Sequence, residues 1–318
     1  FGHFAGSEEA FRHWDGDGGV VPATCARCHA PGGLPQYLQE GVNVSQPAGN
    51  GMLCTTCHSD LTTFARYEVA AVRFPSGLSV DTGSPDSNLC LTCHQGREST
   101  ASVNALIGDK ADDVVSEGLR FLNVHYFAAG ATLFGTEVKG AYEYTGRTYL
   151  GRRVHVEAFD TCAECHGAHT QEVQVAACGG CHPGVAAFGD LVGIRVTPAD
   201  FDGDGNVAEG IAGEIDTMRE ALITAMQAYT GTVAGALPII YDPTAYPYFF
   251  GDADASGVIE EGEAGYNTWT PRLLRAAYNL QYAGKDPGGF AHNPLYIIQV
   301  LYDSLQDVGY DVSGMTRP

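Results

Sequence analysis

The chain has 318 residues, of which 38 are acidic and 17 basic, so its formal charge at pH 7 is −21. Such an excess of negative charge excludes nucleic acid as an expected partner and favours both solubility and bound cations. No apolar run reaches the roughly 18 residues that a membrane-spanning helix requires. The 41 glycines and 15 prolines indicate a loop-rich chain.

The chain changes character near residue 190. Residues 1–189 contain every cysteine and mostly irregular connectors, whereas residues 190–318 contain none. Residues 67–74 have β character, and a turn at 75–77 ends that segment. Alternating aromatic and threonine side chains around a glycine predict a small hairpin within 141–159.

Three segments of the C-terminal region have apolar residues at helical spacing. They predict helices over 211–231, 270–284 and 294–309. Pro271 and Pro294 stand near two of the expected helix starts, where a missing N–H costs little. We therefore expect a mainly α-helical region over 190–318 that packs on residues 1–189.

The ten cysteines form five Cys-x-x-Cys-His motifs, which is the signature of covalent c-type haem attachment. Each thiol adds to one vinyl group of the porphyrin, and the adjacent histidine ligates the iron. Zinc knuckles built from Cys-x-x-Cys pairs do not explain the histidine that follows every pair. A thioredoxin-like motif would be single. The motifs are Cys25, Cys28 and His29; Cys54, Cys57 and His58; Cys90, Cys93 and His94; Cys162, Cys165 and His166; and Cys178, Cys181 and His182.

Five irons need five further axial ligands. An iron with two protein ligands can only transfer electrons, whereas an iron with an open position can bind a substrate. Six histidines lie outside the motifs, so the supply exceeds the demand by one. If every haem has two histidine ligands, no iron is open to substrate. One of the six lies in the helical region and would tie it to the haems. The candidates are His3, His13, His125, His155, His169 and His292.

Residues 252–263 match a calcium-binding EF-hand loop position by position. The alternative is a solvated acidic loop. A bound calcium ion would have a structural role. The expected ligands are Asp252, Asp254, Ser256, Val258 through its carbonyl, Glu260 and Glu263.

A second acidic segment, 200–214, begins in the same way with Asp200, Asp202 and Asp204, followed by Asn206. It then departs from the pattern, because Ile211 stands where the bidentate glutamate belongs. Glu209 or Glu214 would have to complete the set of calcium ligands. The sequence thus predicts one or two calcium ions.

The repeated motifs, the CHGAH form at 165–169 and the HW, NVHY and FAHN histidines resemble multihaem c-type cytochromes of metal-reducing prokaryotes. The resemblance implies a loop-rich chain wrapped around five haems c. Some of these proteins are secreted and polymerise into filaments, and a histidine near the N-terminus then ligates a haem of the next subunit. His3 is the candidate for that role here.

We therefore expect extracellular electron transfer through five bis-histidine haems, in a filament of this chain with itself. Partner cytochromes, a mineral or an electrode would be the redox partners. Haem c is attached outside the cytoplasmic membrane, so Phe1 is read as following a removed secretion signal.

Three alternatives stay open: a periplasmic soluble carrier, a docked subunit of a larger membrane-associated complex, and a pentahaem reductase of nitrite, hydroxylamine or sulfur oxyanions. Pentahaem nitrite reductases carry one Cys-x-x-Cys-Lys motif, which this chain lacks. A non-enzymatic role is thus the expectation.

Overall fold

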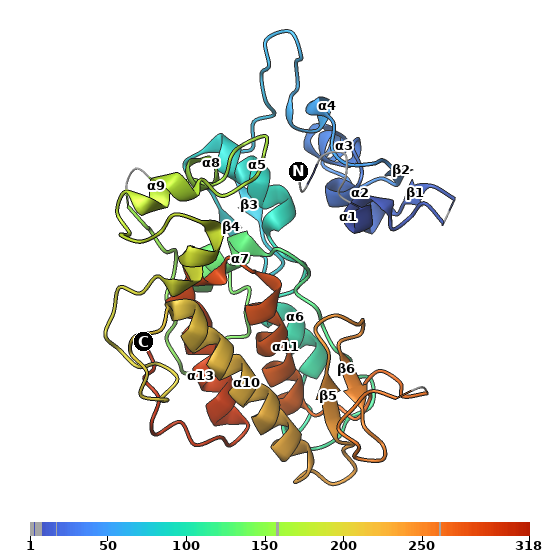
Figure 1. The fold of residues 1–318 in the computed structure, drawn as a ribbon. Helices are drawn as coiled ribbons and strands as arrows, with labels where there is room; N and C mark the ends of the chain where they lie inside the picture. The colour runs from blue at the N-terminus through green and yellow to red at the C-terminus, as the bar shows by residue number, and fades with distance from the viewer. Residues whose placement is uncertain (1–2, 4–7, 17, 157–158, 261) are drawn as a thin grey trace. The chain divides into compact units, whose positions relative to one another are not determined.

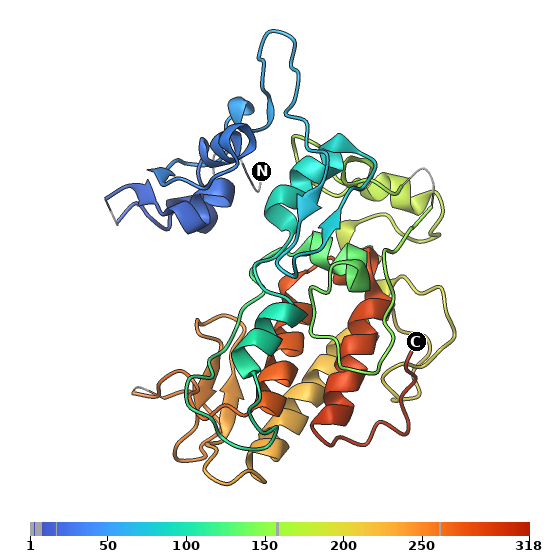
Figure 2. The same cartoon turned by 180° about the vertical axis from the view of Figure 1, so that it is seen from behind.

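The computed structural model describes residues 3, 8–16, 18–156, 159–260 and 262–318 (Figures 1 and 2). The chain divides into two compact units. Unit 1 comprises Phe1–Val72, Ser79–His94 and Val154–Phe188; unit 2 comprises Arg73–Leu78, Gln95–Arg153 and Gly189–Pro318. All five motifs belong to unit 1. Residues 95–153, which the sequence prediction assigned to the haem-binding region, group with the C-terminal helices.

Unit 1 consists of short helices joined by long loops. Strands β1 (Val20–Val21) and β2 (Gln46–Pro47) pair antiparallel, with Val20 opposite Pro47. Strands β3 (Val72–Arg73) and β4 (Ser79–Val80) form a second two-stranded sheet. The short segment Arg73–Leu78 belongs to unit 2, and the residues on either side of it belong to unit 1. The helices are α1 (Glu8–Arg12), α2 (Ala23–His29), α3 (Gly33–Glu40), α4 (Cys54–Cys57), α5 (Pro85–His94), α8 (Cys162–Cys165) and α9 (Val175–Gly179).

The polypeptide of unit 1 builds little apolar core of its own. A cluster of buried residues consists of Val21, Ala26 and Ala30. Leu34 and Leu91 are also buried, whereas other large apolar side chains of the unit are exposed, among them Leu53 at 59% and Phe64 at 64%. Because a stable unit of this size needs more buried apolar surface than these residues supply, another apolar group is expected to cover them.

Unit 2 contains a conventional hydrophobic core. Helices α10 (Ile211–Thr230), α11 (Pro271–Lys285) and α13 (Pro294–Asp307) lie side by side in both views (Figures 1 and 2). Leu222, Leu274 and Leu301, one from each helix, are fully buried. The smaller elements are α6 (Thr100–Ile107), α7 (Ala129–Phe134), the 3-10 turns η1 (Gly135–Glu137) and η2 (Phe188–Gly193), β5 (Ile239–Tyr241), β6 (Phe249–Gly251) and α12 (Gly289–His292).

Local sequence explains where the long helices begin. The Thr270 hydroxyl accepts a hydrogen bond from the Leu273 N–H at 3.1 Å, and Pro271 follows as the first helical residue of α11. Asn293 caps α13 in the same way, ahead of Pro294. The three predicted helices therefore form within one or two residues of their expected bounds.

The prediction of a hairpin within 141–159 is wrong for the residues that the structure describes there. A turn joins Tyr144 to Arg147 around Gly146, whose φ is +81°, but 141–156 and 159 contain no strand. The β character of 67–74 is confirmed at Val72–Arg73. Among the described residues, none of the helices is both long and apolar enough to cross a membrane.

Candidate haem sites and cation loops

Each motif places its two cysteines on a single helical turn. The N–H of the motif histidine donates to the carbonyl of the first cysteine at 2.9 Å for His58, 2.8 Å for His166 and 2.9 Å for His182. His29 and His94 are the last residues of α2 and α5. The chain then becomes extended, with φ −97° and ψ 120° at His58. This turn presents two thiols and an imidazole together, as attachment to one porphyrin requires.

The third motif lies between two others within unit 1. A hydrogen bond with Cys162 raises the pKa of the Cys90 thiol, and a hydrogen bond with Cys28 raises the pKa of the Cys93 thiol. Burial likewise raises the pKa of the Cys57 thiol. Cysteines of the first, third and fourth motifs thus lie within hydrogen-bonding reach of one another.

The zinc alternative finds no support in the described part of the chain. The groups there with ligand atoms close enough to share a cation consist of carboxylates alone, and none contains a cysteine or a histidine. Structural zinc requires four nitrogen or sulfur ligands around one point.

Three motif histidines face a second histidine. The ring centres of His58 and His169 lie 6.3 Å apart with planes at 15°. The corresponding distances are 5.5 Å for His94 and His3, with planes at 70°, and 6.0 Å for His182 and His155, with planes at 66°. Each of these pairs could supply two histidine ligands to one haem iron.

Hydrogen bonds orient several of these imidazoles. The Nδ1 atom of His29 lies 2.7 Å from the Ala10 carbonyl oxygen, and that of His58 lies 2.8 Å from the Phe64 carbonyl oxygen. A carbonyl only accepts, so Nδ1 carries the proton and Nε2 keeps a lone pair for a metal. The Nδ1 atom of His3 contacts the side-chain oxygen of Gln171 in the same manner.

The other three candidate histidines have distinct surroundings. His13 packs against Trp14, which in turn packs against His29. His125, at φ +80°, lines a cavity of about 490 Å³ in unit 2 with aromatic side chains such as Trp269. His292, also in unit 2, places Nδ1 2.8 Å from the buried carboxylate of Asp286.

The 252–263 loop has the hydrogen bonds of a cation-binding turn. Asp252 accepts from the N–H groups of Ser256 and Gly257, at 2.9 and 3.0 Å. Glu263 reaches back to the Ala253 N–H at 3.2 Å. The carboxylates of Asp252, Asp254 and Glu263 converge, with ligand atoms within 4.8 Å of one another. Val258 and Glu260 are exposed on the same loop.

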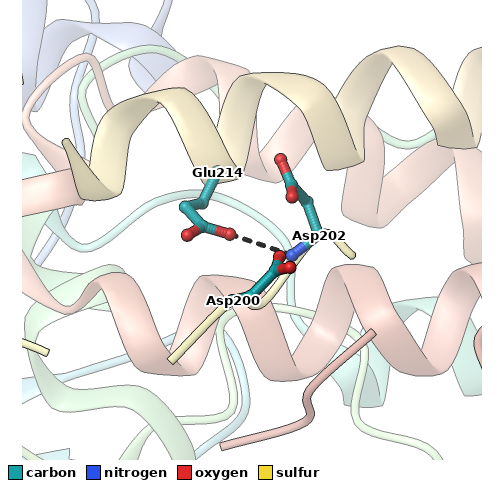
Figure 3. A group of neighbouring side chains, drawn as sticks. All are labelled: Asp200, Asp202 and Glu214. Carbon is teal, nitrogen blue, oxygen red and sulfur yellow. Dashed lines mark hydrogen bonds between the residues drawn. The ribbon is translucent and has the colours of Figure 1, made fainter. Parts of the chain in front are cut away.

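The 200–214 segment folds into a similar turn. Asp200 accepts from the Gly203 and Gly205 N–H groups at 2.7 and 2.9 Å, and Asp202 and Asp204 each accept from the residue two positions on. Glu214, from α10, reaches into the turn (Figure 3). Burial, followed by the nearby charges of Glu214 and Asp204, raises the pKa of Asp202 to about 6.

Sequence reasoning missed the residues that support these sites. Gln171 and Asp286 orient candidate ligands, and Arg195 pairs with Glu214. Their residue types are common on any polar surface, and Gln171 lies 168 positions from His3 in the chain. Only Gln171 carried a signal, because it lies in the short connector between two motifs.

Two relatives match nearly the whole chain. The C-type polyheme cytochrome OmcB of Geobacter sulfurreducens is 27% identical over 366 aligned positions, which cover 95% of this chain and 46% of OmcB. The C-type polyheme cytochrome OmcC of the same organism is 26% identical over 353 positions, covering 92% of this chain and 44% of OmcC. The chain thus spans less than half the length of these curated relatives. No family model matches it, and no solved structure does so significantly.

Proposed function

We propose that this chain, which is homologous to multihaem c-type cytochromes of metal-reducing bacteria, transfers electrons through five covalently attached haems. The homology confirms the resemblance to that class of cytochrome. The chemistry that haem supplies is one-electron exchange at iron. The observation that carries the proposal is that three motif histidines each face a second histidine ring at 5.5, 6.0 and 6.3 Å.

This spacing supports specific ligand pairs. His169 would complete the second motif with His58, His3 the third with His94, and His155 the fifth. The first and fourth motifs would draw on the remaining candidates. At these three motifs two histidines would hold the haem iron, which suits one-electron transfer and would leave no position for a substrate there.

The fit between unit 1 and haem also rests on its apolar surface. Side chains such as Leu53, Phe64 and Phe188 are exposed at 59%, 64% and 64%. Covering such surface is favourable by about 25 cal/mol per Å². Porphyrin faces would cover this exposed apolar surface.

An anaerobic reductive titration followed by haem absorbance tests this function. We expect reversible uptake of five electrons per chain and no turnover of nitrite, hydroxylamine or sulfite. Turnover of any of these at a rate typical of enzymes, roughly 1 per second or faster, would favour the reductase alternative.

The proposal places the chain outside the cytoplasmic membrane, at the cell surface or, alternatively, in the periplasm, and includes assembly with itself. Partner cytochromes or an extracellular mineral or electrode would accept the electrons. His3 lies against His94 within one chain. Exchange of the N-terminal arm between neighbouring chains would make the same pair an inter-subunit contact, as in domain swapping.

Calcium would have a structural role at the 252–263 loop. Asp252 is 5% exposed and Asp254 is exposed beside it, and a divalent cation would offset their repulsion with Glu263. Ser256 and the Val258 carbonyl are the expected neutral ligands. Removing the ion is expected to loosen this loop without changing the haem spectrum.

A further inference from the structure

The segment around residues 200–214 gathers five carboxylates at the start of α10, which is more negative charge than its surroundings balance. Asp202 and Glu214 are 6% and 0% exposed. Arg195 is the basic partner that the structure gives to this group, with Nη1 2.6 Å from the Glu214 carboxylate. Buried charges are stable only when they are paired, so the site calls for a further cation.

Glu214 is already committed to other partners. Its Oε2 accepts from the N–H of Phe201 at 2.8 Å and from the N–H of Asp202 at 2.9 Å. Figure 3 shows the second of these bonds. Its Oε1 is the oxygen that faces Arg195. Glu214 therefore anchors the turn to α10 and to Arg195.

Asp202 and Glu209 each have a buried oxygen without a hydrogen-bond donor, as does Glu214, whose Oε1 is held by the ion pair with Arg195. Among the described residues, Asp202 Oδ2 and Glu209 Oε1 are buried atoms without a hydrogen-bond donor. Ligand atoms of Asp202, Asp204 and Glu209 lie within 4.8 Å of one another. Buried acceptors without donors, on carboxylates whose ligand atoms lie this close together, indicate a missing positive ligand.

Glycine at position 213 provides the room for this arrangement. A Cβ there would collide with the Glu209 carboxylate. Glycine is unfavourable inside a helix, and Gly213 lies in the first turn of α10. The glycine thus lets Glu209 fold back over the helix start towards Asp202.

We propose that Asp202, Asp204 and Glu209 bind a calcium ion, with Glu209 closing the shell in place of the glutamate that the EF-hand pattern puts at Ile211. Hard carboxylate oxygens in a flexible turn suit calcium. The site is separate from the 252–263 loop, and it does not depend on the haem function. It links the cation to the packing of α10.

The test uses the intact haem-loaded chain with its other loop disabled by Asp252→Asn and Glu263→Gln. Equilibrium dialysis with calcium should give one ion per chain in this background. Adding Glu209→Gln should raise the dissociation constant for calcium at least tenfold. Glu220→Gln, an exposed glutamate of α10, is the matched control and should leave the constant unchanged.

Asp202→Asn separates a ligand role from a structural one. It should abolish calcium binding and yet raise the unfolding midpoint of the calcium-free protein, because it removes a buried charge next to Glu214. No bound calcium in the background chain, or an unchanged dissociation constant with Glu209→Gln, would overturn the proposal. So would calcium-independent destabilisation by Asp202→Asn together with retained binding.

Discussion

At the scale of single residues, hydrogen bonds orient the imidazole rings of the candidate ligands. A histidine whose Nδ1 donates to a carbonyl presents Nε2 in one fixed direction. His58, held by the Phe64 carbonyl at 2.8 Å, faces His169 across 6.3 Å. The ligand from the connector after the fourth motif would therefore serve the haem of the second motif. A connector between motifs would then supply a ligand to a haem other than its neighbours in sequence.

Replacing His169 with methionine tests that pair. Histidine–methionine ligation raises a haem potential relative to bis-histidine ligation, so we expect one haem of five to shift upward in a redox titration. The shift should vanish when the second haem is removed by Cys54→Ser and Cys57→Ser, since the two changes then act on one site. Thr170→Ala, next to His169, is the control. A shift that persists without the second haem would show that His169 serves another iron.

Glu143 provides a pH-dependent prediction in unit 2. Its carboxylate accepts from the Thr136 and Tyr296 hydroxyls at 2.9 and 3.0 Å, and burial raises its pKa above the ordinary value of 4.5. The folded state therefore binds more protons than the unfolded state between that value and the raised pKa, and stability falls as pH rises through this window. We expect Glu143→Gln to reduce this decline in the denaturation midpoint, and exposed Glu220→Gln to preserve it. If the denaturation midpoints of Glu143→Gln and of the unmodified chain depend on pH in the same way, Glu143 does not cause the decline.

At the scale of elements, unit 2 is held together by apolar packing between α10, α11 and α13. Buried polar residues join the helices to the preceding loops. The Asn279 side chain accepts from the Tyr142 N–H at 2.8 Å and donates to Ser304 Oγ at 3.0 Å. These contacts explain why residues 95–153 group with the helices. Because the residues in contact are far apart in the sequence, local sequence patterns do not predict these contacts.

Truncating Leu222 should destabilise this packing. The side chain is fully buried on α10, and a buried leucine-to-alanine change costs about 2–5 kcal/mol. We expect Leu222→Ala to lower the free energy of unfolding by that amount, measured by denaturant titration of the helical circular dichroism signal. Glu220→Ala, exposed on the same helix, should change it by less than about 0.5 kcal/mol. Similar free energies of unfolding for the two variants would mean that the packing of α10 does not stabilise unit 2.

The sequence predicts the haem motifs and the long helices because these depend on local spacing. The helices over 211–231, 270–284 and 294–309 have periodic apolar faces, and each ends near a glycine. The hairpin within 141–159 fails because Tyr142, Tyr144 and Tyr149 pack against residues of unit 2 instead of pairing as strands. The pairing of His58 with His169 was beyond prediction, since two rings 111 positions apart meet only through tertiary structure.

At the scale of the whole molecule, the charge of −21 opposes close approach of identical chains. A filament would therefore need a specific link, and the N-terminal arm with His3 is the candidate. Electron microscopy of the native secreted material should show filaments, and His3→Ala should abolish them if the arm is exchanged between chains. Discrete particles in the unmodified sample would favour a diffusible or docked carrier. Filaments that persist in His3→Ala would place the link elsewhere.

The most direct test of the central claim is the electron paramagnetic resonance spectrum of the oxidised protein, integrated against its iron content. Five bis-histidine haems predict five irons per chain, all of them low-spin. A high-spin ferric signal amounting to one iron per chain, or fewer than five irons, would contradict the account. A high-spin iron would direct attention to substrate chemistry.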